Sequence, residues 1–356
     1  MSMDKNISTN EKGVVRWQSP SNIALVKYWG KYGNQLPKNP SLSLTLKNSY
    51  SDTKVNYEYY KNQKKIGFSL KFESKTNIKF AMKVGKFLKN IRPLFKYLDN
   101  YNLAIESSNT FPHSAGIASS AAFYSSLALC LCSMEEKVLN KKRNQKAFYR
   151  KASDMARLGS GSASRSVYGG VVLWGKMKGI VNSSNKYAIS LKGKQYNKLK
   201  NICDTILIVS SEEKKISSTI GHSLMQDNPY AKVRFKDATD NLARLLVGMK
   251  RNNRKDFISI VERDALSLHA MMMTSHPSFM LLEPNTISII NAVREYRGKT
   301  GANICFTLDA GPNVHLLYPK NEKNKVMKFI KSKLLKYCEK KRFIKDEVGD
   351  GPREMI

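Results

Sequence analysis

One uncharged stretch constrains the fold of this chain more than any other feature of its sequence. Residues 107–134 include no charged side chain, and a polar loop with Pro112 and Gly116 passes directly into a predicted helix of small residues. Gly116 allows the backbone to bend where a side chain would obstruct it. The first turn of the helix offers N–H groups without intrahelical partners, and Ser119 and Ser120 add hydroxyl groups. We therefore expect an anion-binding site here, above all for a nucleotide phosphate.

Other interpretations of this stretch stay open when it is taken alone. It is long enough to span a bilayer, but its serines, Pro112 and His113 favour a buried core helix behind a loop, because Ser-rich segments partition poorly into lipid. A purely structural Gly–Ser turn is a further alternative. The stretch is not the Walker pattern, since no Gly-Lys-Ser or Gly-Lys-Thr follows.

The net charge of +33 raises the question of a nucleic-acid partner. The surplus is mostly Lys spread along the chain, without the alternation of basic and aromatic residues typical of RNA-binding surfaces. We therefore expect no specific nucleic-acid partner, and we interpret the charge as a positive field that attracts polyanionic small substrates.

Length and cysteine use narrow the class of protein. A chain of 356 residues can form two domains with their own cores. The five cysteines are odd in number and scattered in apolar contexts, which argues against a disulfide framework or a zinc site. Residues 1–13 are polar and have no apolar segment of a secretory signal. We expect a flexible tail over 1–13, domains over 14–198 and 199–356, a cytoplasmic location and no membrane partner.

Hydrophobic periodicity predicts an α+β fold, with strands first and helices interspersed. The predicted strands are 14–17, 23–29, 42–46, 53–59, 103–105, 167–174, 206–209, 303–307 and 314–318. The predicted helices are 78–98, 116–133, 144–157, 230–250, 253–272, 285–296 and a basic helix over 321–338.

A second motif runs from Ser19 to Lys31 and continues into an unusual polar–apolar strand over 39–46. Residues two apart on a strand share a face, so Lys27, Trp29 and Lys31 would lie together. Tyr28 would point the other way unless a bulge or turn near Gly30 re-aims it. Two ammonium groups on one face can hold a multiply charged anion. From the spacing alone, a solvated strand face with two ordinary lysines is the better explanation.

A third motif, Gly159-Ser-Gly-Ser-Ala-Ser-Arg-Ser166, precedes Tyr168-Gly-Gly170 and an apolar strand. Small residues permit a tight loop, and Ser160 and Ser162 offer hydroxyl groups. Arg165 offers a planar fork suited to a carboxylate or a phosphate. A flexible loop with a surface arginine is the alternative, although the immediate return to an apolar strand makes a mere linker a poor explanation.

The last motif places Asp309 at the end of an apolar strand, before a Gly-Pro turn. Such an acid can project from a rigid element into a cleft. An Asp that caps a turn is common before Gly, and from this motif alone we would favour that interpretation.

Together these segments resemble one family, the diphosphomevalonate decarboxylases of the GHMP kinase superfamily. The matching stretches run in family order over nearly the whole chain: 19–31, 39–46, 109–122, 159–170, 214–221 and 306–313. The uncharged stretch resembles the superfamily's phosphate loop, Pro-x-x-x-Gly-(Leu/Ile)-x-Ser-Ser. His113 stands where Thr is more usual and His222 where Met is more usual, which could alter the nucleotide pocket modestly.

The resemblance implies a two-domain GHMP-kinase-like fold. An N-terminal ribosomal-protein-like β/α domain would bind ATP, a C-terminal α/β sandwich would follow, and the active site would lie in the cleft between them. The family phosphorylates the tertiary C3 hydroxyl of (R)-5-diphosphomevalonate with ATP, after which loss of phosphate and carbon dioxide yields isopentenyl diphosphate. ATP and Mg²⁺ are therefore the expected cofactors, diphosphomevalonate the expected substrate and a homodimer the expected assembly.

The same resemblance implies catalytic roles for Asp309, Lys27 and Arg165. Asp309 would position the C3 hydroxyl or accept its proton, because a tertiary alcohol is a poor nucleophile. Lys27 beside it would keep the carboxylate ionised and neutralise developing charge. Arg165 would hold the substrate carboxylate.

Binding roles are implied for further residues of the motifs. Tyr28, Lys31 and Ser160 would hold the diphosphate, Ser162 would lie near the substrate carboxylate, and Ser218 would touch both ligands. Ser120 would also contact Mg²⁺. The residues implied for ATP are Pro112, Ser114, Ala115, Gly116, Ile117, Ala118, Ser119, Ser120 and Lys214.

Two alternative functions stay open from the sequence. A related kinase would phosphorylate mevalonate or its monophosphate without decarboxylation. A basic RNA-binding protein would share the ribosomal-protein-like topology of the first domain, so fold alone does not exclude it. Such a protein, however, has no need for Asp309 in an apolar turn facing Lys27.

Overall fold

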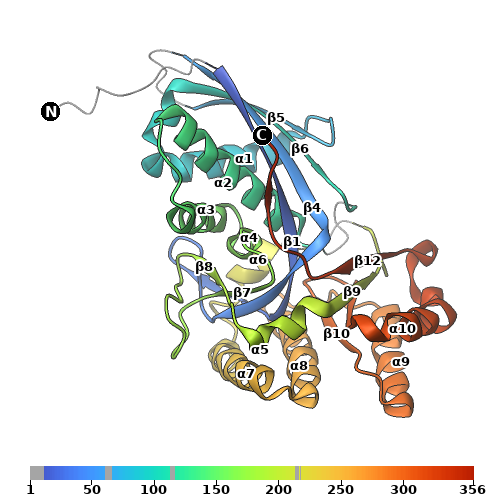
Figure 1. Cartoon of the computed structure of the whole chain (residues 1–356). Helices are drawn as coiled ribbons and strands as arrows, with labels where there is room; N and C mark the ends of the chain where they lie inside the picture. Colours follow the sequence, from blue (N-terminus) through green and yellow to red (C-terminus); the bar gives the residue numbers. More distant parts are fainter. Residues whose placement is uncertain (1–11, 61–65, 113–116, 213–215, 217) are drawn as a thin grey trace.

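Two long antiparallel strands, β1 (Lys12–Val26) and β4 (Ser41–Tyr59), form the frame of the molecule (Figure 1). The computed structural model describes residues 12–60, 66–112, 117–212, 216 and 218–356. We predicted separate strands over 14–17 and 23–29, but β1 is continuous and ends at Val26. It continues through its polar middle because buried partners satisfy those side chains: the Ser19 hydroxyl contacts the Ser125 hydroxyl and donates to the Ser166 carbonyl.

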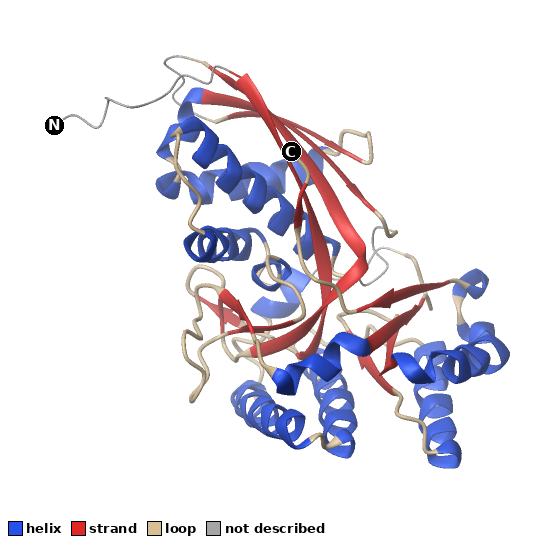
Figure 2. Cartoon of the chain, in the orientation of Figure 1, coloured by secondary structure: helices blue, strands red, loops and turns tan. Residues whose placement is uncertain are grey.

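The larger sheet has the strand order β13-β1-β4-β6-β5, and β7 pairs with β4 and β8. Its further strands are β5 (Gly67–Phe72), β6 (Tyr101–Asn109), β7 (Val171–Trp174), β8 (Ala188–Ser190) and β13 (Arg353–Glu354). The helices α1 (Ile78–Ile91), α2 (Ser119–Val138) and α3 (Gln145–Gly159) lie along one side of this sheet (Figure 2). Their apolar faces and the sheet form one core around Trp17, Phe87 and Leu127.

The smaller sheet is antiparallel, with the strand order β10-β11-β9-β12. Its strands are β9 (Ile202–Leu207), β10 (Cys305–Leu308), β11 (Val314–Pro319) and β12 (Phe343–Glu347). The helices α9 (Pro284–Thr300) and α10 (Lys323–Phe329) pack on one face. The other face shares a core with β1, β4 and the helices α7 (Ala231–Arg251) and α8 (Arg254–Met273), so the two sheets are joined through apolar contacts.

Shorter elements connect these layers. They are β2 (Lys31–Tyr32), β3 (Leu36–Pro37), α4 (Ala163–Ser166), α5 (Lys194–Asn197) and α6 (Ser218–Ser223). Single 3₁₀ or π turns lie at Arg92–Leu94, Lys96–Asn100, Lys198–Asn201, Lys320–Glu322, Ile330–Leu334, Leu335–Tyr337 and Glu339–Lys341. The helices predicted over 78–98 and 321–338 therefore each break into a shorter α-helix followed by such turns.

The C-terminal segment returns to the first sheet. After β12, the short strand β13 pairs Trp17 with Glu354. The Ser133 hydroxyl donates to the Glu354 carboxylate, and Arg143 forms an ion pair with it. In the part of the chain that is described, no helix is both long and apolar enough to cross a membrane.

Candidate active site

The end of β1 presents Lys27 at the junction of the two sheets. Because β1 stops at Val26, the backbone groups of Lys27 fall outside the strand ladder and need other partners. Its N–H donates to Oδ2 of Asp264 at 2.6 Å, and its carbonyl accepts a hydrogen bond from Nδ2 of Asn39 at 2.9 Å. Side chains from two distant segments therefore fix the backbone of this lysine.

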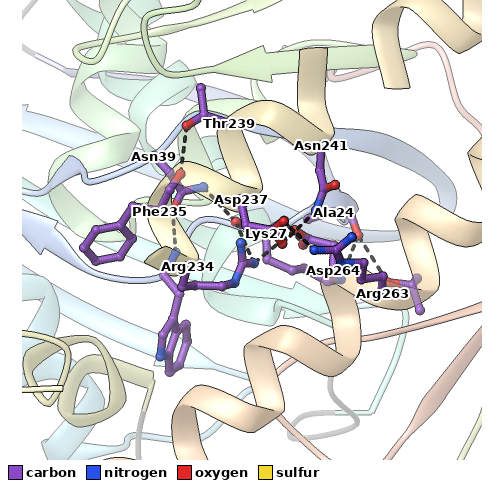
Figure 3. Close-up of polar contacts among 12 residues, drawn as sticks. Ala24, Lys27, Asn39, Arg234, Phe235, Asp237, Thr239, Asn241, Arg263 and Asp264 are labelled. Atoms are coloured by element: carbon purple, nitrogen blue, oxygen red, sulfur yellow. Dashed lines mark hydrogen bonds and ion pairs between the residues drawn. The ribbon is translucent and has the colours of Figure 1, made fainter. Parts of the chain in front are cut away.

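Asp264 of α8 and Arg234 of α7 form a buried ion pair beneath Lys27 (Figure 3), with Nη2 and Oδ1 3.1 Å apart. Burial raises the pKa of Asp264, while Arg234 and the Lys27 N–H act in the opposite direction. We did not predict either residue. The available signal was weak: Asp264 lies four residues from both Ile260 and Leu268, on the apolar face of its helix.

The Lys27 ammonium group is buried and donates to the Ala24 carbonyl at 2.7 Å. Burial lowers its pKa to about 8, and the neighbouring carboxylates of Asp309 and Asp264 act against that shift. The positive charge is thus kept in a low-dielectric position largely by these two acids. The predicted proximity of Lys27 and Asp309 is present in the structure.

Asp309 follows β10 directly and is only partly exposed. Its carbonyl lies 3.1 Å from Nε2 of His269 and accepts the N–H of Gly311 at 2.8 Å, which fixes the backbone of the turn. Its carboxylate opposes the lowering of the pKa values of Lys27, Arg165 and His222 by burial and adds to the raised pKa of Tyr28, so it lies among all four groups. The four groups come from three segments that are widely separated in sequence, because Lys27 and Tyr28 are neighbours.

Arg165 is buried in α4 and held by the polar residues of β1 and β4. Its Nε donates to Asn22 Oδ1 at 3.2 Å and to Ser43 Oγ at 3.1 Å, and its Nη1 donates to Ser41 Oγ at 2.7 Å. Burial lowers its pKa to about 10, with Tyr28 and Asp309 opposing. The unusual polar–apolar strand noted in the sequence therefore supplies the hydroxyl groups that orient this guanidinium.

Three serines join the phosphate loop to the Gly-Ser motif. Ser160 Oγ lies 3.5 Å from Ser120 Oγ and 3.4 Å from Ser162 Oγ. Ser120 is exposed in the first turn of α2 and is free to meet a ligand from solvent. Ser120, predicted for ATP, and Ser160 and Ser162, predicted for the substrate, therefore form one continuous row of hydroxyl groups.

The described part of the phosphate loop is anchored to β1. The Ser21 hydroxyl donates to the Ile117 carbonyl at 2.5 Å, and Pro112 is exposed. Ala118 has the left-handed φ of +42° directly before Ser119, which opens α2. The predicted contacts at Ser114, Ala115, Gly116 and Lys214 lie outside the described residues, as do His113 and the side chain of Ser218, which begins α6.

The strand-face prediction for Lys27, Trp29 and Lys31 was wrong, because the strand ends before Lys27. The turn that we gave as its alternative is present: Gly30 has a φ of +91°, and Lys31 opens β2 with its ammonium group 2.7 Å from Gln35 Oε1. Burial raises the pKa of Tyr28 to about 12, which keeps its phenol protonated. His222, set aside in the sequence as a small departure, contacts this same turn.

No three His, Cys, Asp or Glu side chains gather as metal ligands within the described residues. A groove of about 920 Å³ between α8 and α9 contains none of the predicted site residues. The candidate site is therefore the junction itself, where a buried lysine, an acid, an arginine and a row of serines meet beside a phosphate loop.

A phosphate loop that enters α2 behind a mixed sheet, with a second α/β layer supplying an acid, is the arrangement expected for the GHMP-kinase-like class. The comparisons with known proteins narrow that class. A model of the diphosphomevalonate decarboxylase-like N-terminal domain matches residues 19–186, and one of the mevalonate 5-diphosphate decarboxylase C-terminal domain matches 205–353.

Individual relatives agree with the two domain models. The diphosphomevalonate decarboxylase of Debaryomyces hansenii is 30% identical over 332 residues, covering 87% of this chain and 80% of the relative. The mevalonate diphosphate decarboxylase structure from Staphylococcus aureus superposes with a TM-score of 0.82 at 26% identity, covering 97% of this chain and 98% of the other. A structure described as "MDDEF in complex with MVAPP, AMPPCP and Magnesium" has the same TM-score and identity, over 97% and 99%. The chain belongs to the diphosphomevalonate decarboxylase family.

Proposed function

We propose that this protein catalyses the ATP-dependent decarboxylation of (R)-5-diphosphomevalonate to isopentenyl diphosphate, ADP, phosphate and carbon dioxide, a step of the mevalonate pathway of isoprenoid biosynthesis. The observation that carries this proposal is the meeting of Lys27, Asp309 and Arg165 at one junction. The relatives reported above are decarboxylases by name, and none of them favours the alternative of a 3-kinase that stops before decarboxylation.

Asp309 and Lys27 serve the first half of the reaction. Asp309 accepts the proton of the C3 hydroxyl as that oxygen attacks the terminal phosphorus of ATP and the bond to ADP breaks. Lys27, held by Asp264 and Asn39, places a positive charge beside that acid and stabilises charge that develops on the oxygen. Removal of Asp309 would take away one of the two acids that oppose the lowering of the pKa of the buried Lys27 ammonium group.

Arg165 serves the second half. The C3–oxygen bond breaks with release of phosphate, and the bond to the carboxylate carbon breaks with release of carbon dioxide, its electron pair forming the new double bond. Arg165 holds the carboxylate so that this bond aligns with the departing phosphate. The guanidinium can do so because Asn22, Ser41 and Ser43 fix its plane.

ATP and Mg²⁺ are the cofactors, as in the solved relative that holds an ATP analogue and magnesium. Backbone N–H groups at the start of α2 and the Ser120 hydroxyl suit phosphate oxygens and a hard cation. Bound Mg²⁺ would neutralise charge on the phosphates.

Further features of the proposal are the two domains over 14–198 and 199–356, a homodimer in the cytoplasm, and Tyr28, Lys31 and Ser160 as the diphosphate site. The test is product analysis by mass spectrometry after incubation with ATP, Mg²⁺ and each mevalonate phosphoform. Isopentenyl diphosphate formed from diphosphomevalonate supports the proposal. A stable 3-phosphorylated product without isopentenyl diphosphate would replace it with the kinase.

A further inference from the structure

The buried side chain of His222 contacts three consecutive residues of the turn after β1. Its imidazole stacks on Tyr28, with centroids 4.7 Å apart and planes at 24°, and lies 4.3 Å from the ring of Trp29. Its Nδ1 accepts the N–H of Gly30 at 2.9 Å. One residue of α6 therefore contacts two aromatic side chains and one backbone N–H of this turn.

The hydrogen bond that the Gly30 N–H donates to His222 takes the place of one that a neighbouring strand would otherwise accept. Gly30 is buried and lies between the end of β1 and the start of β2, so its N–H has no ladder partner. A buried backbone N–H without an acceptor is costly, and a residue at φ +91° is held there only by its surroundings. The imidazole nitrogen is thus the acceptor that allows the chain to turn toward Lys31.

The backbone of α6 approaches Trp29 closely enough to keep this contact in place. A Cβ atom added to Gly221 would lie 2.6 Å from Cζ2 of Trp29, so only glycine permits this approach. The geometry places His222 in a slot formed by Tyr28, Trp29 and Gly30.

Burial, with the neighbouring ammonium group of Lys31, keeps the imidazole of His222 neutral. Burial lowers its pKa to about 3, the ammonium group of Lys31 lowers it further, and the carboxylate of Asp309 acts in the opposite direction. A neutral ring that accepts at Nδ1 carries its proton on Nε2. Met, the more usual residue here, would fill the slot but offers only a weak acceptor, so in this chain the ring adds a hydrogen bond.

We propose that His222 is a positioning residue that holds the turn from Tyr28 to Lys31 in the conformation that receives the diphosphate end of the substrate. This inference rests on the proposed function. Because the diphosphate is a handle remote from C3, misplacement of the turn weakens substrate binding more than it slows the chemical steps.

Two variants separate the packing contribution of the aromatic ring of His222 from the contribution of its hydrogen-bond acceptor, Nδ1. His222→Phe keeps an aromatic ring between Tyr28 and Trp29 but leaves the Gly30 N–H unpaired. His222→Asn loses the ring but keeps an acceptor at the position of Nδ1. We expect the Phe variant to raise KM for diphosphomevalonate about tenfold, since an unpaired buried N–H costs on the order of 1–3 kcal/mol. KM for ATP should change less than twofold, and the Asn variant should recover most of the substrate KM.

The kinetic results that would overturn the proposal differ from those expected. A Phe variant with wild-type substrate KM, or one whose KM for ATP rises equally, overturns the proposal, and so does an effect on kcat alone. Thermal unfolding midpoints identify a variant that has lost its fold, and Gly221→Ala then serves as a second variant that displaces Trp29. If the wild-type protein forms no isopentenyl diphosphate, the proposed function fails, while calorimetric titration with inorganic diphosphate still compares the variants.

A spectroscopic measurement tests the geometry without substrate. The chain has five histidines, and a long-range ¹H–¹⁵N spectrum compared with that of His222→Asn assigns the signals of this ring. We expect an unprotonated Nδ1 and a protonated Nε2 that persist down to about pH 5. A proton on Nδ1 near neutral pH would contradict the hydrogen bond from Gly30 and with it the proposal.

Discussion

The backbone N–H of Lys27 donates a hydrogen bond of 2.6 Å to Oδ2 of Asp264, which lies 237 positions later in the chain. The other oxygen of that carboxylate pairs with Arg234 at 3.1 Å. A buried acid of the second half of the chain therefore both neutralises a buried arginine and fixes the backbone of the proposed catalytic lysine.

Asp264→Asn should cost stability as well as activity. The amide still offers an oxygen to Lys27, but Arg234 is left as a buried charge without its partner, at about 3–5 kcal/mol in the free energy of unfolding. Urea denaturation measures the loss. Asp240→Asn, on the exposed pair with Lys236, is the matched control and should change little. Equal losses in the free energy of unfolding of the two variants would contradict a special role for the buried ion pair of Asp264 and Arg234.

Asp309→Asn keeps the shape of the side chain and removes its charge. We expect the rate of product formation to fall by roughly 10²–10⁴-fold, as is usual when a general base is lost, while substrate still binds. Steady-state assays of carbon dioxide release together with calorimetric binding of diphosphomevalonate separate the two effects. Wild-type turnover in this variant would exclude Asp309 from the reaction.

The buried ammonium group of Lys27 predicts opposite pH dependences for activity and stability. Because burial lowers its pKa from 10.5 to about 8, kcat should fall above about pH 8 as the charge is lost. Between about pH 8 and 10.5 the unfolded chain binds a proton that the folded chain does not, so the contribution of Lys27 to the free energy of unfolding rises with pH. Subtracting the profile of Lys27→Met isolates that contribution. A contribution that falls over this window would contradict the burial of the charge.

Arg165→Lys retains a positive charge but not the planar fork. Because three separate groups fix the guanidinium plane, we expect kcat to fall at least about tenfold although the charge is conserved. If phosphorylation and decarboxylation separate in this variant, the 3-phosphorylated intermediate should accumulate in mass spectra. A kcat equal to that of the wild-type protein would show that charge alone is sufficient.

The left-handed backbone of Ala118 predicts a stabilising substitution beside the phosphate loop. Ala118→Gly should raise the free energy of unfolding by about 0.5–1 kcal/mol, because a left-handed residue with a Cβ costs about 1–2 kcal/mol and the added flexibility of Gly offsets part of the gain. Urea denaturation measures the change. Ala121→Gly, inside α2, is the control and should destabilise the protein. A loss of stability in both variants would contradict the strained geometry.

The sequence predicted the long amphipathic helices well and the strands less well. The predicted ranges 230–250 and 253–272 differ from α7 and α8 by one residue at each end, because period-3.6 patterns over twenty residues are unambiguous. β1 and β4 were each divided in two, because their polar middles look like turns until buried partners are known. β13 spans two residues and has no pattern of its own.

The residues of the candidate site, like the elements of the fold, were predicted from the sequence only in part. Asp309, Arg165 and Lys27 were singled out through the family resemblance, because the motifs of Lys27 and Asp309 taken alone favoured ordinary lysines and a turn-capping acid, and the structure brings the three side chains near one another. Asp264, Arg234 and the structural use of Asn39 were missed, because their partners are backbone groups whose need for hydrogen bonds arises only where β1 ends. His222 was noticed as a departure, but only the folded chain shows what its ring contacts.

The return of the C-terminal segment has a consequence for synthesis. The carboxylate of Asp346, in β12, accepts the N–H groups of Lys47, Asn48 and Ser49, which precede it by 297 to 299 positions. At roughly 5–20 residues per second, the ribosome adds Asp346 about 15–60 s after the segment Lys47–Ser49 that its carboxylate holds. The phosphate loop thus leaves the ribosome long before this segment of β4 acquires its carboxylate partner. Nascent chains stalled before Asp346 should therefore be more sensitive to protease in this segment than the released protein.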